Sequence, residues 1–160
     1  MTVYLLRHAR AGRRSAWAGD DDLRPLTKVG KRQAASIVEL LGDARITRIV
    51  SSPYVRCRQS VEPLAQQLRL AVDLADALAE GAALGDVVQL VEKVGDETTV
   101  LCTHGDVVKA FLEHLRENGV GIGKRRAAPL MEKGSVWTLD TLGGEVTTAT
   151  YLAPPRPPGK

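Results

Sequence analysis

Residues 3–12 of this 160-residue chain read Val-Tyr-Leu-Leu-Arg-His-Ala-Arg-Ala-Gly. The first four are apolar, β-branched or aromatic, and a short run of this kind is typical of a fully buried strand. The predicted strand over residues 3–6 therefore ends on Arg7 and His8. A basic pair at the end of a buried strand is the first indication of a functional site, and two later strands repeat the arrangement.

These two strands also end on polar residues. Residues 46–50 are followed by Ser-Ser-Pro-Tyr-Val-Arg, in which the arginine is Arg56. Residues 98–102 are followed by Thr-His-Gly, in which the histidine is His104. Ligands of parallel α/β sheets bind outside the carboxyl ends of the strands. We therefore expect the three segments to meet at one edge of a sheet.

The rest of the chain alternates strand with helix, which predicts an α/β fold with a mostly parallel sheet. Thr27 can cap a helix and Gly42 is a natural stop, whereas Pro63 predicts a kink or a break in the next helix. Gly143 and Gly144 separate two strand-like runs and predict a C-terminal hairpin. A loop is expected over residues 9–24, helices over 27–41, 55–68, 86–94 and 106–117, a weaker strand over 71–74, and hairpin strands over 136–142 and 146–152.

Composition fits an ordinary soluble globular protein, with 44% hydrophobic and 26% charged residues. One domain is expected over residues 1–153, followed by a proline-rich disordered tail over 154–160. The net charge of +3 suits an anionic substrate but is too small to indicate nucleic-acid binding. No signal peptide or membrane-spanning stretch is expected, and the two cysteines are expected to be buried thiols, so we place the chain in the cytoplasm without a membrane partner.

The residue types at the three strand ends suit phosphoryl transfer. Arginine binds two phosphate oxygens with its planar fork, so Arg7 and Arg56 are the expected phosphate clamps. Imidazole is partly deprotonated near neutral pH, which makes His8 the expected nucleophile of a phosphohistidine intermediate. His104 is expected to donate a further hydrogen bond to the phosphoryl oxygens. Neither cysteine has a cysteine or histidine at metal-finger spacing, so the cysteines indicate no metal site, and none of these motifs calls for a cofactor.

The leaving group also requires a proton donor. Glu80, in the loop after the weak strand at residues 71–74, is the first candidate for this catalytic role. Asp86 and the acidic run 20–22 are weaker candidates.

Three residues are expected to contact the substrate. Arg24 precedes a predicted helix and is a candidate for binding substrate or phosphate. Ser51 either binds phosphate or caps the following helix. Trp17 either lines the substrate entrance or only packs its loop, and the basic run 124–126 either grips an anionic substrate or is a solvated loop.

With these motifs in order, the chain resembles the histidine phosphatase (phosphoglycerate-mutase-like) superfamily over nearly its whole length. The segment 23–30, Leu-Arg-Pro-Leu-Thr-x-x-Gly, and the compact length are most similar to the short SixA-type phosphohistidine phosphatases. The run 133–137, Lys-Gly-Ser-Val-Trp, is also similar to histidine phosphatase domains fused to some Nudix hydrolases, although the chain contains no Nudix segment. The resemblance implies a three-layer α/β/α sandwich and a metal-independent phosphatase acting on a phosphomonoester or phosphohistidine, through phospho-His8 held by Arg7, Arg56 and His104.

Two positions depart from the family pattern: Ala9 replaces the usual glycine, and Ser60 stands where threonine is common. The long insertions that form a substrate lid in mutases are missing, which argues against a mutase. A phosphatase for a small nucleotide or sugar phosphate is one alternative. A non-catalytic module that binds phosphorylated partners is another, although such a module has no need of a nucleophile.

Overall fold

The computed structural model describes residues 1–123 and 130–155. The basic run 124–126 lies outside them, and so does most of the predicted tail, residues 156–160. None of the described helices is long and apolar enough to cross a membrane. The strands are β1 (Thr2–Arg7), β2 (Arg48–Ser51), β3 (Val72–Leu74), β4 (Thr99–Thr103), β5 (Val136–Leu142) and β6 (Glu145–Leu152), and the α-helices are α1 (Lys28–Leu41), α2 (Val55–Leu68), α3 (Leu84–Val94) and α4 (Gly105–Glu117).

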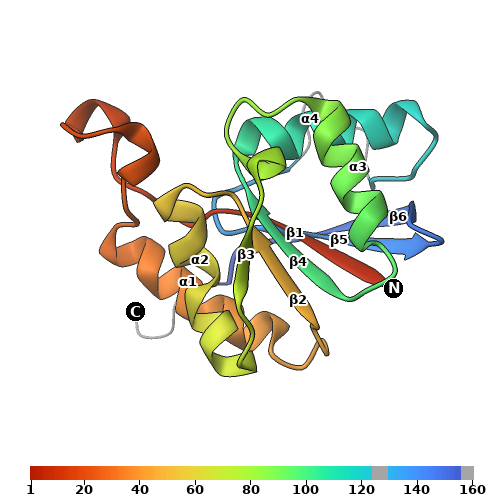
Figure 1. Cartoon of the computed structure of the whole chain (residues 1–160), viewed down its shortest axis with the longest axis horizontal. Helices are drawn as coiled ribbons and strands as arrows, with labels where there is room; N and C mark the ends of the chain where they lie inside the picture. Colours follow the sequence, from red (N-terminus) through yellow and green to blue (C-terminus); the bar gives the residue numbers. More distant parts are fainter. Residues whose placement is uncertain (124–129, 156–160) are drawn as a thin grey trace.

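The six strands form one sheet in the order β3-β2-β4-β1-β5-β6 (Figure 1). The neighbours among β1 to β4 pair in parallel, whereas β5 is antiparallel to β1 and β6 is antiparallel to β5. Parallel strands require long crossovers, and α1, α2 and α3 occupy the three crossovers between β1 and β4. The predicted α/β fold, with its mostly parallel sheet and C-terminal hairpin, is confirmed.

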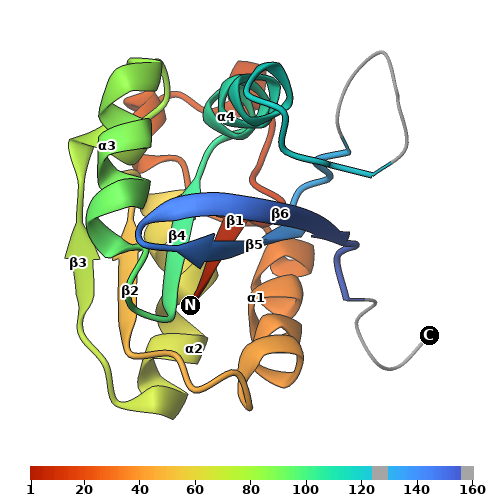
Figure 2. The same cartoon turned by 90° about the vertical axis from the view of Figure 1, so that its right-hand side faces the viewer.

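Helices cover both faces of this sheet, which makes the three layers seen in Figures 1 and 2. Alternate strand residues point to opposite faces. Leu5 and Leu101 therefore join the cluster packed by α3 and α4, while Leu6 and Cys102 join the cluster packed by α1 and α2. All four are fully buried. Burying a leucine side chain contributes roughly 1.5–3 kcal/mol, so both helical layers are held to the central strands mainly by apolar contact.

The three central strands end at the same level. The register pairs Arg7 at the end of β1 with Thr103 at the end of β4, and Ser51 at the end of β2 with Cys102. The pairing continues past β1, because the His8 amide donates to the Thr103 carbonyl at 3.0 Å. The segments that follow these strands are therefore brought to one edge, as the sequence predicts.

The predicted helices and strands all form, with small shifts at their ends. Thr27 caps α1, and its side chain accepts a hydrogen bond from the Gly30 amide at 3.1 Å. The first residues of α3 and α4 are Leu84 and Gly105, slightly before the predicted starts. Two short 3-10 turns lie in the loop predicted over residues 9–24.

Of the kink or break predicted at Pro63, the break is wrong, because α2 runs without interruption from Val55 to Leu68. A proline inside a helix removes one backbone hydrogen bond and costs about 3 kcal/mol. Val61 and Leu64 flank the proline and are fully buried. Their packing against the sheet offsets that cost and keeps the helix in one piece.

A long loop leaves β1 and returns to α1. Ala11 and Leu26 pair at its base, and we refer to residues 11–26 as the 11–26 loop. In Figure 1 this orange-red segment projects from the body of the molecule. The base of the loop lies very close to α1, since a Cβ atom on Gly30 would sit 1.9 Å from the Arg10 carbonyl oxygen. Only glycine allows this approach of two backbone segments.

Replacing Gly30 by alanine should therefore destabilise the fold. We expect Gly30→Ala to lower the free energy of unfolding by about 1–3 kcal/mol, measured by urea denaturation, because backbone has to move to admit the methyl group. Gly85→Ala is the matched control in the first turn of α3, where a Cβ would have no neighbour within 4 Å. That control should be neutral or slightly stabilising. Equal stability of the two variants would contradict the proposed close approach.

Candidate active site

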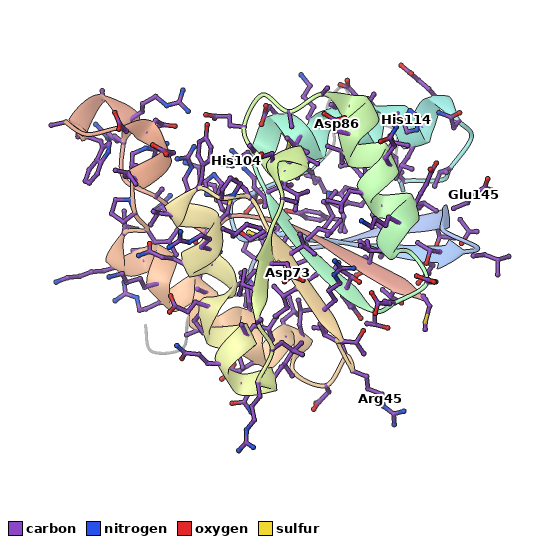
Figure 3. All side chains as sticks on the ribbon, in the orientation of Figure 1. Arg45, Asp73, Asp86, His104, His114 and Glu145 are labelled. Atoms are coloured by element: carbon purple, nitrogen blue, oxygen red, sulfur yellow. The ribbon has the colours of Figure 1, made fainter. Side chains whose placement is uncertain are left out.

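A cavity of about 270 Å³ lies at the carboxyl edge of the central strands. Six of its lining residues are arginine or lysine and two are acidic, so it suits an anionic ligand. In Figure 3, His104 lies at this edge, whereas His114 lies on the distant part of α4. The lining residues are Arg7, His8, Arg14, Arg24, Arg56, Glu80, His104, Gly105, Asp106, Lys109, Met131 and Lys133.

The His8 ring is held in one orientation. Its Nδ1 atom lies 2.8 Å from the Ala9 carbonyl oxygen, so Nδ1 carries the proton and Nε2 keeps its lone pair. Burial lowers the pKa of His8 to about 3; the hydrogen bond to Ala9 opposes this effect, and the charges of His104, Arg56 and Arg7 reinforce it. His8 is therefore a neutral imidazole at physiological pH, which is the form a nucleophile requires.

His104 faces His8, with the ring centroids 5.4 Å apart in an edge-to-face arrangement. Its Nε2 atom lies 2.8 Å from the Ser52 hydroxyl and 3.5 Å from the sulfur of Cys57. Nδ1 of His104 is buried and has no hydrogen-bond partner among the described residues. Ser52 thus orients the ring of His104 and leaves one ring nitrogen for a ligand.

Arg7 lies against the first turn of α4. A Cβ on Gly105 would approach the guanidinium carbon of Arg7 to 2.8 Å, so a larger residue here would displace the guanidinium from its present position. One terminal nitrogen of Arg7 donates to the Met131 carbonyl at 2.7 Å. The buried Nε of Arg7 has no partner within the described ranges.

Arg56 is almost completely buried, with 1% of its surface exposed. Its two terminal nitrogens donate to Asp21, one to the backbone carbonyl at 2.8 Å and the other to the carboxylate at 3.1 Å. Its Nε, like that of Arg7, has no partner in the part of the chain that the structure describes. Arg7, Arg56 and His104 therefore each present one buried nitrogen without a protein partner. Such groups are costly unless they bind something, and the oxygens of a phosphoryl group would satisfy them.

Glu80 lies at the same cavity, as the sequence predicts. Its carboxylate accepts a hydrogen bond from Arg14 at 2.9 Å and lies 3.6 Å from Arg56. The loop that carries it is anchored on both sides. Thr103 donates to the Leu78 carbonyl, and Asp106 accepts from the Gly81 amide.

Other predicted residues occupy different places. Arg24 is buried and lines the cavity. Ser51 is fully buried outside the cavity lining, and its hydroxyl donates to the Ser52 carbonyl. Trp17 is 38% exposed and donates from its ring to the Asp20 carbonyl. The weaker proton-donor candidate Asp86 is exposed on α3, outside the lining.

The structure brings to the cavity two lysines to which the sequence assigned no role in the site. Lys109 lies on α4 one turn after Gly105, and helical spacing on the Thr-His-Gly segment could have indicated it. Lys133 comes from the segment before β5. Burial and the charges of Arg7 and Arg10, among other arginines, lower the pKa of Lys133, which shows that it shares the same positive field.

The two departures from the family pattern fit the site. Ala9 is fully buried and is not among the residues with a positive φ, so its position does not demand glycine. The Ser60 hydroxyl accepts a hydrogen bond from the Ala9 amide at 2.9 Å and donates to the Arg56 carbonyl at 2.6 Å. One hydroxyl thus links the backbone of the His8 segment to the helix that carries Arg56.

With this geometry established, the comparison with known proteins gives the family. The model of the histidine phosphatase superfamily (branch 1) matches residues 3–89. The chain belongs to this superfamily. A protein of Mycolicibacterium smegmatis named 8-oxo-(d)GTP phosphatase is 35% identical over 161 residues, a match that covers 96% of this chain and 48% of that protein. The chain thus spans about half the length of this relative.

Solved structures share the fold. The protein histidine phosphatase SixA complexed with tungstate has a TM-score of 0.72 at 19% identity, covering 96% of this chain and 95% of that one. YhfR of Bacillus stearothermophilus has a TM-score of 0.74 at 17% identity, covering 91% and 93%. A mycobacterial glucosyl-3-phosphoglycerate phosphatase has a TM-score of 0.66 at 17% identity, covering 94% and 96%. The predictions of a histidine phosphatase and of its layered fold are confirmed at the level of the superfamily.

The lowered pKa of His8 has a consequence for stability. Its value is about 3 in the fold and 6.5 in the unfolded chain, so below pH 6.5 the unfolded chain takes up a proton that folded His8 does not. The free energy of unfolding should therefore decrease as the pH falls from about 6.5 toward 3, by up to roughly 1.4 kcal/mol per pH unit from this group.

Urea denaturation of the wild type and of His8→Gln between about pH 7 and 5 measures this effect. The wild type should lose more stability on acidification than His8→Gln, which cannot titrate at this position. His114→Gln, on the distant part of α4, should behave as the wild type does. Parallel pH dependence of the wild type and His8→Gln would show that His8 is not held neutral by the fold.

Proposed function

We propose that this chain is a metal-independent phosphatase that hydrolyses a phosphomonoester or phosphohistidine through a phospho-His8 intermediate. One observation carries the proposal. His8, whose Nε2 keeps its lone pair, lines the same cavity as Arg7, Arg56 and His104, and each of these three has a buried nitrogen without a partner among the described residues. A nucleophile and donors for the equatorial oxygens are the two requirements of phosphoryl transfer. A module that only binds phosphate would need the donors but not the neutral imidazole.

The first step transfers the phosphoryl group to His8. The lone pair on Nε2 attacks phosphorus, and the bond from phosphorus to the leaving atom breaks. The leaving atom keeps the bonding electrons and takes a proton from Glu80, which carries one at the start of the cycle. Arg7, Arg56 and His104 stabilise charge on the three phosphoryl oxygens, while the Ala9 carbonyl accepts from Nδ1–H and stabilises the positive ring of phosphohistidine.

The second step releases phosphate. Water attacks phosphorus and gives its proton to the Glu80 carboxylate, and the electrons of the phosphorus–nitrogen bond return to Nε2. His8 is again neutral and Glu80 is again protonated, so the cycle closes. No step requires a metal ion, because positive side chains surround the phosphoryl group.

A nucleotide phosphate is the second candidate substrate. The relative at 35% identity is named for a nucleoside triphosphate, and Lys109 and Lys133 add positive charge to the cavity beyond the three phosphoryl ligands. Under this alternative, the lysines bind a further phosphate of the leaving group. Relative kcat/KM for a phosphohistidine peptide, a sugar phosphate and a nucleoside diphosphate would separate the candidates.

The proposal predicts turnover without metal. The wild type treated with EDTA should hydrolyse para-nitrophenyl phosphate or a phosphohistidine peptide, and His8→Ala should lose at least about 10³-fold in kcat. Acid quenching should trap an acid-labile phosphoenzyme in the wild type but not in His8→Ala. If the wild type binds phosphate yet turns over none of the substrates named above and gives no phosphoenzyme, the chain is a binding module.

The role of Glu80 is tested by varying the leaving group. An alkyl phosphate needs a proton from Glu80, whereas para-nitrophenolate leaves unaided. We expect Glu80→Gln to lower kcat/KM, which reports the phosphoryl-transfer step, by about 10²-fold for an alkyl phosphate and only about threefold for para-nitrophenyl phosphate. Asp86→Asn, an exposed acid on α3, is the matched control and should leave both rates unchanged. Equal losses of kcat/KM on the two substrates would show that Glu80 does not protonate the leaving group.

A further inference from the structure

We propose that Asp21 is a positioning residue, which holds the guanidinium of Arg56 so that its Nε edge faces the phosphoryl group. The inference rests on the proposed function in one respect, that Arg56 binds the phosphoryl group. Nothing in the family comparison assigns a role to Asp21, and from the sequence it is only a weaker proton-donor candidate within the acidic run 20–22.

The contacts of Asp21 with Arg56 are made in two places. The backbone carbonyl of Asp21 accepts from one terminal nitrogen of Arg56 at 2.8 Å, and its carboxylate accepts from the other at 3.1 Å. These two hydrogen bonds occupy the end of the guanidinium that carries its two terminal nitrogens. The side edge, which carries Nε, has no partner in residues 1–123 and 130–155. A guanidinium has five N–H groups in a rigid fork, so fixing its end also fixes the direction of its side edge.

Asp21 is itself held in place by two further arginines of the 11–26 loop. Nε of Arg24 donates to the Asp21 carboxylate at 3.1 Å, and Nε of Arg14 lies 3.3 Å from the same oxygen. Arg24 is buried and also donates to the Gly12 carbonyl near the base of the loop. The position of Asp21 is therefore set by the folded loop rather than by Arg56 alone.

Charge supports the same conclusion. A guanidinium as buried as that of Arg56 requires a counter-charge, and Asp21 provides the nearest carboxylate. Burial raises the pKa of Asp21, but the hydrogen bonds and charges of Arg24 and Arg56 outweigh it and the net shift is downward. Asp21 is therefore ionised at neutral pH, and it is a fixed anion rather than a proton donor.

A competing interpretation is that Asp21 occupies Arg56 in place of the phosphoryl group and inhibits binding. The geometry favours positioning, because Asp21 accepts from the two terminal nitrogens of the guanidinium and leaves Nε without a partner among the described residues. The two interpretations predict opposite effects of removing the carboxylate charge. Positioning predicts weaker binding of a phosphoryl analogue, and competition predicts tighter binding.

The test is the affinity for orthovanadate, measured by calorimetry on the full chain, together with kcat/KM for para-nitrophenyl phosphate. We expect Asp21→Asn to weaken vanadate binding by about tenfold and to lower kcat/KM by roughly 10–100-fold, the usual effect of losing a residue that orients a ligand-binding group. Asp22→Asn, the exposed neighbour in the same turn, is the matched control and should change both less than about twofold. Two further measurements show whether the 11–26 loop has merely lost its fold. They are thermal unfolding of Asp21→Asn, and vanadate binding by Asp21→Glu, in which the charge is restored.

A double-mutant cycle shows whether the effect passes through Arg56. In an Arg56→Lys background, Asp21→Asn should change vanadate affinity less than about twofold, because the fork that Asp21 orients is gone. Tighter or unchanged vanadate binding by Asp21→Asn would overturn the inference, and so would an equal loss in both backgrounds. Since vanadate binding is measured without turnover, a chain that binds it through Arg56 but hydrolyses nothing would refute the proposed phosphatase and leave the positioning role intact.

Discussion

The site depends on keeping positive charge buried at the end of a hydrophobic sheet. Arg56 is 1% exposed and His8 6%, so water does not solvate them as it would at a surface. The two groups meet this constraint differently. His8 loses its proton, while Arg56 stays charged and takes Asp21 as its counter-ion. The same burial thus produces a neutral imidazole beside a charged guanidinium, the combination that the proposed phosphoryl transfer to histidine requires.

The order and direction of the strands bring these buried groups together. Because β1, β4 and β2 are parallel neighbours that end level, Arg7 and His8 come to lie beside His104 although nearly a hundred residues separate them in the chain. Small residues then set the final distances. Gly105 admits the guanidinium of Arg7, and Ser60 ties the backbone after His8 to α2. The strands bring the side chains of the site together, and these local contacts fix their orientation.

Which features could be predicted from the sequence depends on how far apart in the chain the interacting residues lie. Strand ends are marked by local changes from apolar to polar residues, so Arg7, His8, Arg56 and His104 could be placed at one edge before the structure was known. The Asp21–Arg56 pair spans 35 residues and depends on how the 11–26 loop folds back, which no local pattern encodes. Likewise, the Ser-Ser pair does not reveal which hydroxyl reaches His104; the register of β2 assigns that contact to Ser52.

The phosphoryl-binding groups alone do not determine the substrate. Solved structures with this fold carry the names of a protein histidine phosphatase and of a sugar phosphate phosphatase, so one fold serves different leaving groups. Selectivity must come from residues that touch the leaving group rather than the phosphoryl oxygens. In this chain Lys109 and Lys133 are the candidates for such contacts, since they line the cavity but are not among the three proposed phosphoryl ligands. Their positive charge favours a leaving group that carries negative charge of its own over a neutral one.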